Sequence, residues 1–388
     1  MNVKFSPNLG DGLLSECLEG ALIEHGASPQ TRSADLAGRT AYGDTMAGRG
    51  AIMKTLDALP GGLRQFVVRA PLAIQSRRKW MPHYLEHLAQ AEAVAIGGGN
   101  LLADQDLNFP TKIALALRAC ATRDVPVAFY ACGMGQKWSS EGERRVRSAL
   151  RACPPRAVFL RDQMSKERWD SMFAEASGQE AIVVRDPGLL ARQTYGAVTK
   201  APHGGPRIGI SVMSHIAIRY HAEAGQSEAA LLQWYADLAI ELIGQGAQVT
   251  LFTNGASEDN IALEAVTAKL SGLREKVDVV VPNTPKELSD IVGGLTGLVA
   301  YRMHALISAY SHRVPFLALK WDEKVDAFLE SVGALAWLDD AARLTAKDAA
   351  IKMLDHAELG IDADRHASVI QQAGDDVGRL FAALTASA

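Results

Sequence analysis

The sequence predicts an α/β protein with two lobes, each built on a parallel sheet covered by helices. Three observations favour this fold class. Short apolar segments alternate with amphipathic segments along most of the chain, as in sheets whose parallel strands are connected by helices. The chain has 388 residues, which suits two domains of roughly 150–200 residues each. A cluster rich in Pro and Gly, residues 199–206, separates two such alternating series.

The first lobe is assigned to residues 1–198. It is expected to begin with a strand at residues 2–5, a turn-rich loop at 6–12 and a helix from Leu13. Residues 27–50 are polar, which predicts a long loop. An extended segment at 66–74 and a helix at 80–91 follow. Further strands are predicted at 93–96, 125–131, 157–160 and 182–184, with helices at 111–121 and 139–151.

The second lobe is assigned to residues 206–343. Strands are predicted at 207–212, 248–252, 277–281, 297–301 and 314–319, and helices at 227–244, 258–270 and 285–292. Ser257 is expected to cap the helix at 258–270, because a serine hydroxyl accepts a bond from first-turn amides. Residues 344–388 are predicted as C-terminal helices, which in a two-lobed protein can cross back to brace the first lobe.

Composition excludes several functional classes. The formal net charge is −4, and 22% of residues are charged, so no basic excess attracts nucleic acid. The N-terminus has no apolar signal-peptide core, and no apolar run approaches the ~18 residues that span a membrane. The cysteines are scattered without a CxxC spacing, which favours buried reduced thiols. We therefore expect a cytoplasmic protein.

The most informative stretch follows the predicted strand at 297–301. Arg302, Met303 and His304 come directly after it, and a helix of small residues begins there. Ligands bind at this edge of open α/β sheets, and a helix N-terminus favours anions. Arg302 could hold an anion, and His304 could transfer a proton near neutral pH. A satisfied polar pair at a domain seam is the structural alternative, and spacing alone does not decide between them.

Two glycine-containing loops are further candidates. Asn8, Leu9, Gly10 and Asp11 feed a helix, where a glycine lets the backbone approach a ligand. Asp11 is interpreted as a helix-starting residue in preference to a catalytic base. The run 97–100, three glycines and Asn100, follows a buried strand, and predicts close approach of a substrate or of another loop. Neither loop matches a nucleotide-binding fingerprint.

Two other charged or titratable residues stand at strand ends. Arg161 precedes Asp162, where a surface salt bridge and an anion site are equally good interpretations. His215 follows the strand at 207–212, and for an isolated histidine a core or surface role is favoured. The basic run 77–79 before Trp80 could contact a lipid-linked diphosphate, although a solvated helix start is favoured.

No metal site is predicted. His83 and His87 are one helical turn apart, but Tyr84 stands where a HExxH motif has glutamate. Asp104, Gln105 and Asp106 form a short DxD that arises easily by chance, so a solvated loop is favoured.

Taken in order, these blocks resemble the polysaccharide pyruvyl transferase family. The resemblance is carried by residues 8–11, 97–100, 159–162 with Ser165, Asp186, and Arg302 and His304 with Ile307, Ala309, Pro315 and Lys324. It spans residues 8–333. Two places depart from the family pattern. His312 and Arg313 stand where a glycine is common, and residues 213–215 stand where the family often has an arginine.

The resemblance implies a glycosyltransferase-B-like fold, with two Rossmann-like lobes facing each other across a cleft. It also implies transfer of pyruvate from phosphoenolpyruvate to a sugar, as a ketal in a cell-surface polysaccharide or its precursor. His304 would then be the general acid and Arg302 the anion ligand. The implied substrate-binding residues are Arg161, Lys324, Asn8, Gly10, Asp11, Gly98, Gly99, Asn100 and His215. The first lobe would serve the acceptor, and the reaction needs no metal or organic cofactor.

The expected partners are phosphoenolpyruvate and a saccharide, free or lipid-linked, with no nucleic acid. Peripheral association with the inner face of the membrane and the oligomeric state are left open. Two alternatives stand beside this hypothesis. The first is a nucleotide-sugar-dependent glycosyltransferase of the same fold, with Glu258 or Asp259 near the ribose. The second is a non-catalytic protein that binds an anion or a sugar.

Overall fold

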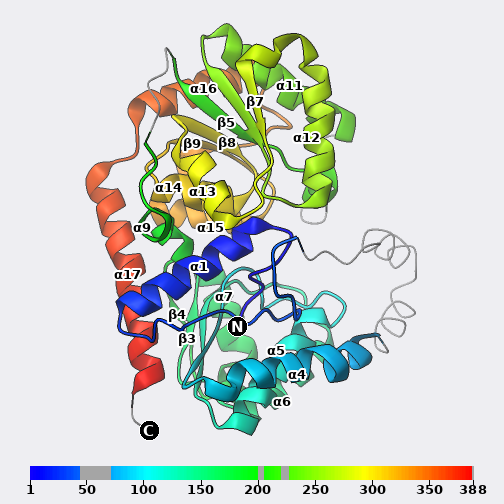
Figure 1. The fold of residues 1–388 in the computed structure, drawn as a ribbon, viewed down its shortest axis with the longest axis vertical. Helices are drawn as coiled ribbons and strands as arrows, with labels where there is room; N and C mark the ends of the chain where they lie inside the picture. The colour runs from blue at the N-terminus through cyan, green and yellow to red at the C-terminus, as the bar shows by residue number, and fades with distance from the viewer. Residues whose placement is uncertain (44–70, 200–204, 220–226, 387–388) are drawn as a thin grey trace. The chain divides into compact units, whose positions relative to one another are not determined.

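The computed structural model describes residues 1–43, 71–199, 205–219 and 227–386 (Figure 1). The chain divides into two compact units. Unit 1 comprises Met1–Ser6, Leu14–Pro187 and Gly374–Ala388, and unit 2 comprises Pro7–Leu13 and Gly188–Ala373. One division therefore falls inside the first helix, α1 (Leu9–Glu24), and another inside the last helix, α17 (Ala363–Thr385). The sequence had placed the boundary at residues 199–205, and the contacts place it at Pro187.

Unit 1 is built on a four-stranded parallel sheet in the order β1-β2-β3-β4. Its strands are β1 (Val94–Gly97), β2 (Val127–Cys132), β3 (Val158–Leu160) and β4 (Ile182–Val183). The two central strands are buried along their whole length. Strands of this kind are apolar throughout because helices cover both faces of the sheet.

The helices of unit 1 bury an aromatic core against this sheet. Trp169 packs against Phe129 and Phe173, and its indole N–H donates to the Gln179 carbonyl over 3.0 Å. Beside α1, the helices are η1 (Ser76–Trp80), α4 (Met81–His87), α5 (Asn108–Arg123), α6 (Ser140–Ala152), α7 (Gln163–Met172) and α8 (Ala174–Ser177).

Unit 2 is built on a six-stranded parallel sheet in the order β10-β9-β8-β5-β6-β7. Its strands are β5 (Arg207–Ser211), β6 (Gln248–Phe252), β7 (Val277–Val280), β8 (Gly297–Ala300), β9 (Phe316–Leu319) and β10 (Leu338–Asp339). The chain builds outward from β5 through β6 to β7, then crosses back to add β8 on the other side of β5. This reversal of direction creates a topological switch point at β5 and β8, which is where α/β proteins bind ligands.

Helices cover both faces of the unit 2 sheet, as Figure 1 shows. They pack partly in pairs, α11 with α16 and α13 with α14. The bounds are α9 (Ala191–Tyr195), α10 (His215–Arg219), α11 (Glu228–Gly244), α12 (Ser257–Lys269), α13 (Pro285–Gly293), α14 (Met303–Ser311), α15 (Glu323–Val332) and α16 (Ala346–Leu359).

The N-terminal segment differs from its prediction. Residues 2–5 form no strand beyond a single bridge between Asn2 and Asp35, and α1 begins at Leu9 instead of Leu13. The helix starts early because the Asn8 side chain accepts a bond from the Gly10 N–H over 3.2 Å, as a helix cap does. Residues 71–74, predicted as extended, are helical. The rest of that predicted segment and residues 44–50 lie outside the described residues.

The end of α17 belongs to unit 1. The Asp376 carboxylate accepts a bond from the Arg185 N–H over 2.6 Å, just after β4. Arg156, which precedes β3, donates to the Leu384 carbonyl over 3.0 Å. These bonds tie the C-terminal end of the chain to the loops around the unit 1 sheet.

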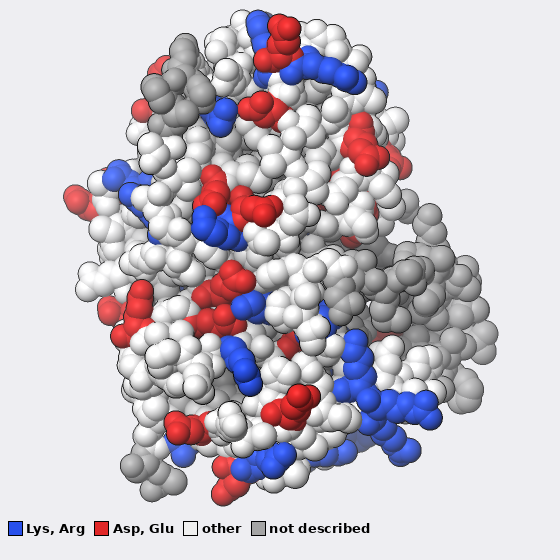
Figure 2. Space-filling model, in the orientation of Figure 1, with Lys and Arg blue, Asp and Glu red and all other residues white. Residues whose placement is uncertain are grey.

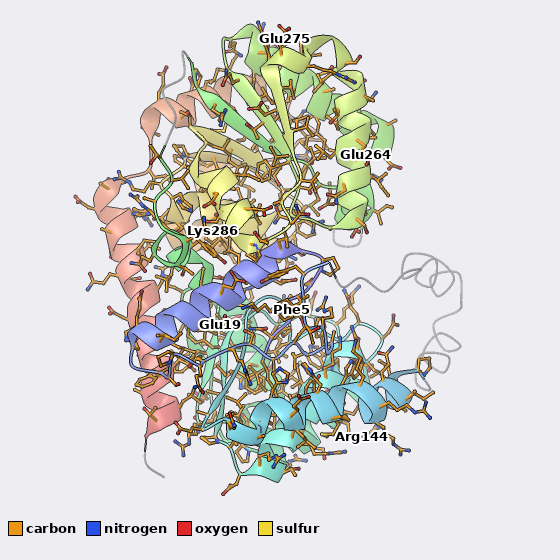
Figure 3. All side chains as sticks on the ribbon, in the orientation of Figure 1. Phe5, Glu19, Arg144, Glu264, Glu275 and Lys286 are labelled. Atoms are coloured by element: carbon orange, nitrogen blue, oxygen red, sulfur yellow. The ribbon has the colours of Figure 1, made fainter. Side chains whose placement is uncertain are left out.

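Charged side chains lie on the surface of both units. Arg144 on α6 and Glu264 on α12 are exposed, and side chains fill the layers between sheets and helices (Figure 3). Acidic and basic side chains are both spread over the face drawn in Figure 2. Arg77, Arg78 and Lys79 are exposed while Trp80 is buried. In the described part of the chain, none of the helices is long and apolar enough to cross a membrane.

Candidate functional site

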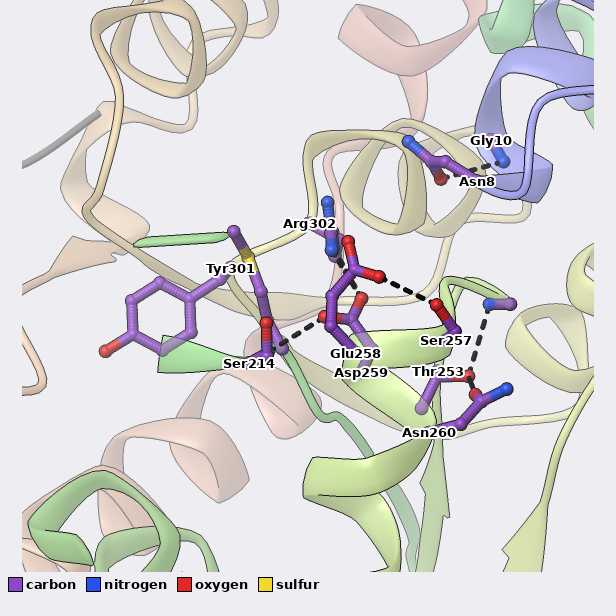
Figure 4. A network of polar contacts seen from close by, with 12 residues as sticks. Asn8, Gly10, Ser214, Thr253, Ser257, Glu258, Asp259, Asn260, Tyr301 and Arg302 are labelled. Atoms are coloured by element: carbon purple, nitrogen blue, oxygen red, sulfur yellow. Dashed lines mark hydrogen bonds and ion pairs between the residues drawn. The ribbon is translucent and has the colours of Figure 1, made fainter. Parts of the chain in front are cut away.

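The carboxyl ends of three neighbouring strands in unit 2 are tied together by one buried ion pair. Arg302 follows β8, Ser214 follows β5 and Asp259 lies in the first turn of α12, after β6. The Arg302 guanidinium donates from Nε, over 2.9 Å, and from Nη2 to the same oxygen of Asp259. The other Asp259 oxygen accepts a bond from the Ser214 N–H over 2.9 Å. Figure 4 shows this network.

This ion pair is largely removed from water. The Asp259 side chain is 0% exposed and that of Arg302 is 13% exposed. Burial raises the pKa of the Asp259 carboxyl, while the Arg302 charge and the Ser214 N–H act in the opposite direction. The pairing holds the guanidinium in one orientation, and Nη1 bonds to no other described residue. A fixed arginine fork of this kind suits the recognition of a carboxylate or phosphate.

His304 is held against the backbone of the first helix. It is 9% exposed and lies in the first turn of α14. A Cβ atom at Gly10 would fall 2.2 Å from His304 Nδ1 and 2.4 Å from its Cβ. Only glycine leaves room for the imidazole at this position. Gly10, which the sequence predicts as a point of close backbone approach, therefore packs against His304, the residue predicted to transfer a proton.

The start of α1 also lies on the loop that follows β6. The Leu9 N–H donates to the Asn254 carbonyl over 2.8 Å. Asn8 caps the helix, and Asp11 lies in the first turn, with its own N–H bonded to the Asn8 carbonyl over 3.1 Å. Asp11 is thus a first-turn acidic residue, favourable to the helix dipole, and Asn8 is the cap.

Two helices at this edge begin without a side-chain cap. Arg302 stands at the N-cap of α14 and Ala256 at the N-cap of α12, and neither side chain bonds to the first-turn amides. The prediction that Ser257 caps α12 is wrong, because Ser257 is the first helical residue and its hydroxyl donates to Glu258 over 3.1 Å. Uncapped first-turn amides carry partial positive charge and attract anions.

Lys324 lies near the same edge of the sheet but is already paired. Its Nζ is 2.8 Å from an Asp322 oxygen and 4.4 Å from the centre of the Trp321 ring. The Trp321 indole donates to the Tyr301 carbonyl over 2.6 Å, which joins the loop after β9 to the residue before Arg302. Asp322 balances much of the lysine charge, so the role of Lys324 as an anion ligand stays a prediction.

The two departures from the family pattern have different surroundings. His312 is buried and lies 2.8 Å from the Ser289 hydroxyl, which joins α14 to α13. His215 is the first residue of the short helix α10 and is half-buried beside Ser214. Its substrate contact stays a prediction.

In unit 1, the glycine run after β1 meets the loop after β2. A Cβ at Gly97 would fall 2.3 Å from the Tyr130 carbonyl oxygen. Gly98 and Gly99 have φ of 85° and 68°, which glycine adopts without strain. The Gly133 N–H donates to the Gly99 carbonyl over 2.8 Å. Of the two explanations offered for these glycines, close approach of another loop is therefore observed.

Arg161 lies flat against this second loop. A Cβ at Gly133 would fall 2.3 Å from Arg161 Nη2. Arg161 Nε donates to Asp162 over 3.3 Å, and the two side chains are 8% and 11% exposed, so this is a buried pair and no surface salt bridge. Asp162 also caps α7 by accepting the Ser165 N–H over 2.6 Å. Asn100 is half-buried at the same edge. Arg161, Asn100, Gly98 and Gly99 thus share one sheet edge in unit 1.

The two sequence patterns that resemble metal sites make structural contacts instead. Asp104 accepts bonds from the Ser139 N–H and hydroxyl over 2.9 and 2.6 Å, which braces the start of α6. The rings of His83 and His87 lie 4.2 Å apart, and His87 Nδ1 is 2.9 Å from the His83 carbonyl oxygen. Within the described residues, no group of three or more His, Cys, Asp or Glu could hold a metal ion.

Asp259 is the site residue whose role the sequence reasoning missed. It was considered only as a ribose ligand, and its carboxylate is engaged by Arg302 and Ser214. A signal was present in the sequence. Asp259, Ala262, Leu263 and Val266 recur at helical spacing and form the buried side of α12. A carboxylate in an apolar stripe predicts a buried cationic partner.

Comparisons with known proteins show the family and the fold, each by a different route. A family model described as polysaccharide pyruvyl transferase matches residues 8–323. A search of curated protein sequences finds no match to this chain. Similar solved structures include one assigned as UDP-N-acetylglucosamine 2-epimerase from Listeria monocytogenes. It has a TM-score of 0.55 and 13% identity over 96% of this chain and 92% of that one.

Two further structures give the same result. MnaA from S. aureus in complex with UDP has a TM-score of 0.55 and 10% identity, over 96% of this chain and 92% of that one. UDP-GlcNAc 2-epimerase from Methanocaldococcus jannaschii has a TM-score of 0.53 and 11% identity, over 78% of this chain and 81% of that one. At such identities the likeness shows the fold alone. The predicted class, α/β with two parallel-sheet lobes of the glycosyltransferase-B type, is confirmed.

The contact between Gly10 and His304 makes a prediction about stability. Gly10→Ala places a methyl group where the imidazole lies, so we expect a loss of about 1–3 kcal/mol, the usual cost of overpacking. Gly244→Ala is the matched control, since Gly244 is also helical and its Cβ would meet nothing within 4 Å. Helix propensity alone favours alanine at both positions.

Thermal unfolding of both variants checks this prediction. Gly10→Ala should lower Tm by several degrees, and Gly244→Ala should leave it equal or slightly higher. Equal Tm values for the two variants would show that His304 does not need the space above Gly10.

Proposed function

Because the chain belongs to the polysaccharide pyruvyl transferase family, we propose that it transfers pyruvate from phosphoenolpyruvate to two hydroxyls of a sugar. The product is a cyclic ketal on a polysaccharide or on its precursor. One observation carries the proposal. Arg302 and His304 stand together at the uncapped start of α14, at the switch point of the unit 2 sheet, and each is held in place by its own contact.

Phosphoenolpyruvate is a small anion with a carboxylate and a phosphate, so its site must supply several donors and positive charge. The first-turn amides of α14 and the Arg302 guanidinium supply both at one place. Asp259 fixes the guanidinium before the substrate binds, which reduces the ordering cost of binding. Much of the Arg302 charge is balanced by Asp259, so a second cation helps to hold the dianionic phosphate.

In unit 1, Arg161 is proposed as an anion ligand. Its Nε is taken by Asp162, and neither Nη1 nor Nη2 has a hydrogen-bond partner among the described residues. The Gly133 backbone, in the loop after β2, packs against the guanidinium and limits its orientation. In this proposal Asn100 and the Gly98–Gly99 backbone line the same edge of unit 1 and contribute to the acceptor side.

The chemistry requires an acid that can reach the enol carbon. In the proposed reaction His304 protonates the methylene carbon of phosphoenolpyruvate, and C2 becomes oxocarbenium-like. One sugar hydroxyl attacks C2, and its proton restores the acid form of His304. The bond between C2 and the phosphate oxygen then breaks, the second hydroxyl adds to C2 to close the ketal, and its proton leaves with the inorganic phosphate. Each step uses side chains and substrates only. The acceptor in this proposal is a saccharide, free or lipid-linked.

Phosphate release tests the proposed reaction. The protein is incubated with phosphoenolpyruvate and a panel of methyl glycosides, and free phosphate and product mass are measured. We expect phosphate release that depends on a glycoside, with a product carrying one added pyruvyl ketal.

We also expect phosphoenolpyruvate alone to raise Tm, because a ligand at 100 times its Kd adds ~2.7 kcal/mol of stability. The absence of both phosphate release and a thermal shift would contradict the proposal. A thermal shift with nucleotide sugars alone would favour a glycosyltransferase.

The general-acid role of His304 is tested by His304→Asn. Asparagine fills a similar space but cannot donate a proton as an acid, so kcat should fall at least ~10²-fold. His87→Asn is the control, since His87 lies on α4 in unit 1 and bonds within its own helix. Full turnover by a folded His304→Asn variant would show that another group protonates the substrate.

A further inference from the structure

Asn254 is a buried polar residue that the proposed chemistry has not yet used. It lies in the loop between β6 and α12, and its side chain is 0% exposed. Both Oδ1 and Nδ2 lack a hydrogen-bond partner among the described residues. Buried polar atoms in proteins are almost always paired, since each one left unpaired lowers stability. An amide that is unsatisfied at both ends therefore needs an explanation.

The loop around Asn254 is held firmly. The Thr253 hydroxyl lies 2.6 Å from Asn260 Oδ1 and accepts the Gly255 N–H over 3.2 Å. Gly255 has φ of 91°, and a Cβ there would fall 2.9 Å from the Leu9 side chain. Thr253 and Ser257, on either side of Asn254 in the chain, are drawn with Arg302 and Asn8 in Figure 4. Asn254 is thus unpaired in a loop whose other polar groups are paired.

The same loop adjoins the proposed acid. The Asn254 carbonyl accepts the Leu9 N–H over 2.8 Å, and Gly10, the next residue, touches the His304 imidazole. Two consecutive residues of α1 therefore separate Asn254 from His304. The uncapped start of α12 is three residues further along the chain. These contacts place Asn254 at the edge of the sheet where Arg302 and His304 also stand.

The two unpaired atoms restrict the chemistry of a ligand. Nδ2 needs an acceptor and Oδ1 needs a donor. Carboxylate and phosphate oxygens accept but do not donate, so phosphoenolpyruvate would satisfy only the nitrogen. Sugar hydroxyls both donate and accept, and two neighbouring hydroxyls satisfy both ends of a carboxamide. We propose that Asn254 binds the hydroxyls of the saccharide acceptor at this edge of the unit 2 sheet. This inference rests on the proposed function.

Asn254→Leu tests the inference, because leucine has a similar volume and no polar atom. The variant should have an unchanged or higher Tm without ligands, since it removes two unpaired groups. Its affinity for a saccharide should fall about tenfold or more, while its affinity for phosphoenolpyruvate stays within about twofold. Saccharide binding is measured with the panel of methyl glycosides by saturation-transfer NMR, and phosphoenolpyruvate binding by calorimetry.

Thr253→Val is the matched control in the same loop. Its hydroxyl is paired, so its loss should lower Tm. If Asn254→Leu lowers Tm as Thr253→Val does and leaves saccharide affinity unchanged, Asn254 has a structural role and the inference is wrong. It is also wrong if the unmodified protein binds none of the glycosides. Glycoside binding through Asn254 without any phosphate release would instead refute the proposed reaction and keep the saccharide site.

Discussion

The buried ion pair between Arg302 and Asp259 is the interaction on which the candidate site depends. It connects the loops after β5, β6 and β8, because Asp259 also accepts the Ser214 N–H. Taking two charges out of water costs several kcal/mol per ion, and burial raises the pKa of Asp259. Such a pair is weak evidence for stability. Its better explanation is that it fixes one guanidinium at a sheet edge, which supports the proposal that Arg302 is an anion ligand.

Two further contacts give this edge its shape. Gly10 leaves room for the His304 imidazole, and the Leu9 N–H bonds to the loop that carries Asn254. The start of α1 therefore contacts both His304, the proposed acid, and Asn254, the residue proposed to bind the saccharide acceptor. The proposed substrate ligands are groups that lower stability in the free protein. They are the uncapped start of α14 and the unpaired carboxamide of Asn254. Proteins commonly retain such costs where they bind ligands.

The sequence predicted the architecture because apolar periodicity and strand-end motifs are local. Most strands, the helix start after β8 and the close backbone approach at the glycines could be predicted from spacing. Pairings between distant segments could not. Nothing in the spacing of Arg302 shows that its partner is Asp259, which precedes it by 43 residues, and the unpaired state of Asn254 depends on what surrounds it. The early start of α1 was missed because Gly10 and Gly12 resembled a loop, whereas the cap at Asn8 and the contact with His304 favour a helix.

The central claim is that phosphoenolpyruvate binds at the switch point of the unit 2 sheet. A crystal structure of the protein with phosphoenolpyruvate measures this most directly. The account predicts an anion that accepts bonds from the first-turn amides of α14 and from Arg302, with His304 beside the methylene carbon. It also predicts that Arg302 keeps its bond to Asp259 in the complex. Phosphoenolpyruvate bound elsewhere, with Arg302 and His304 untouched, would contradict the account.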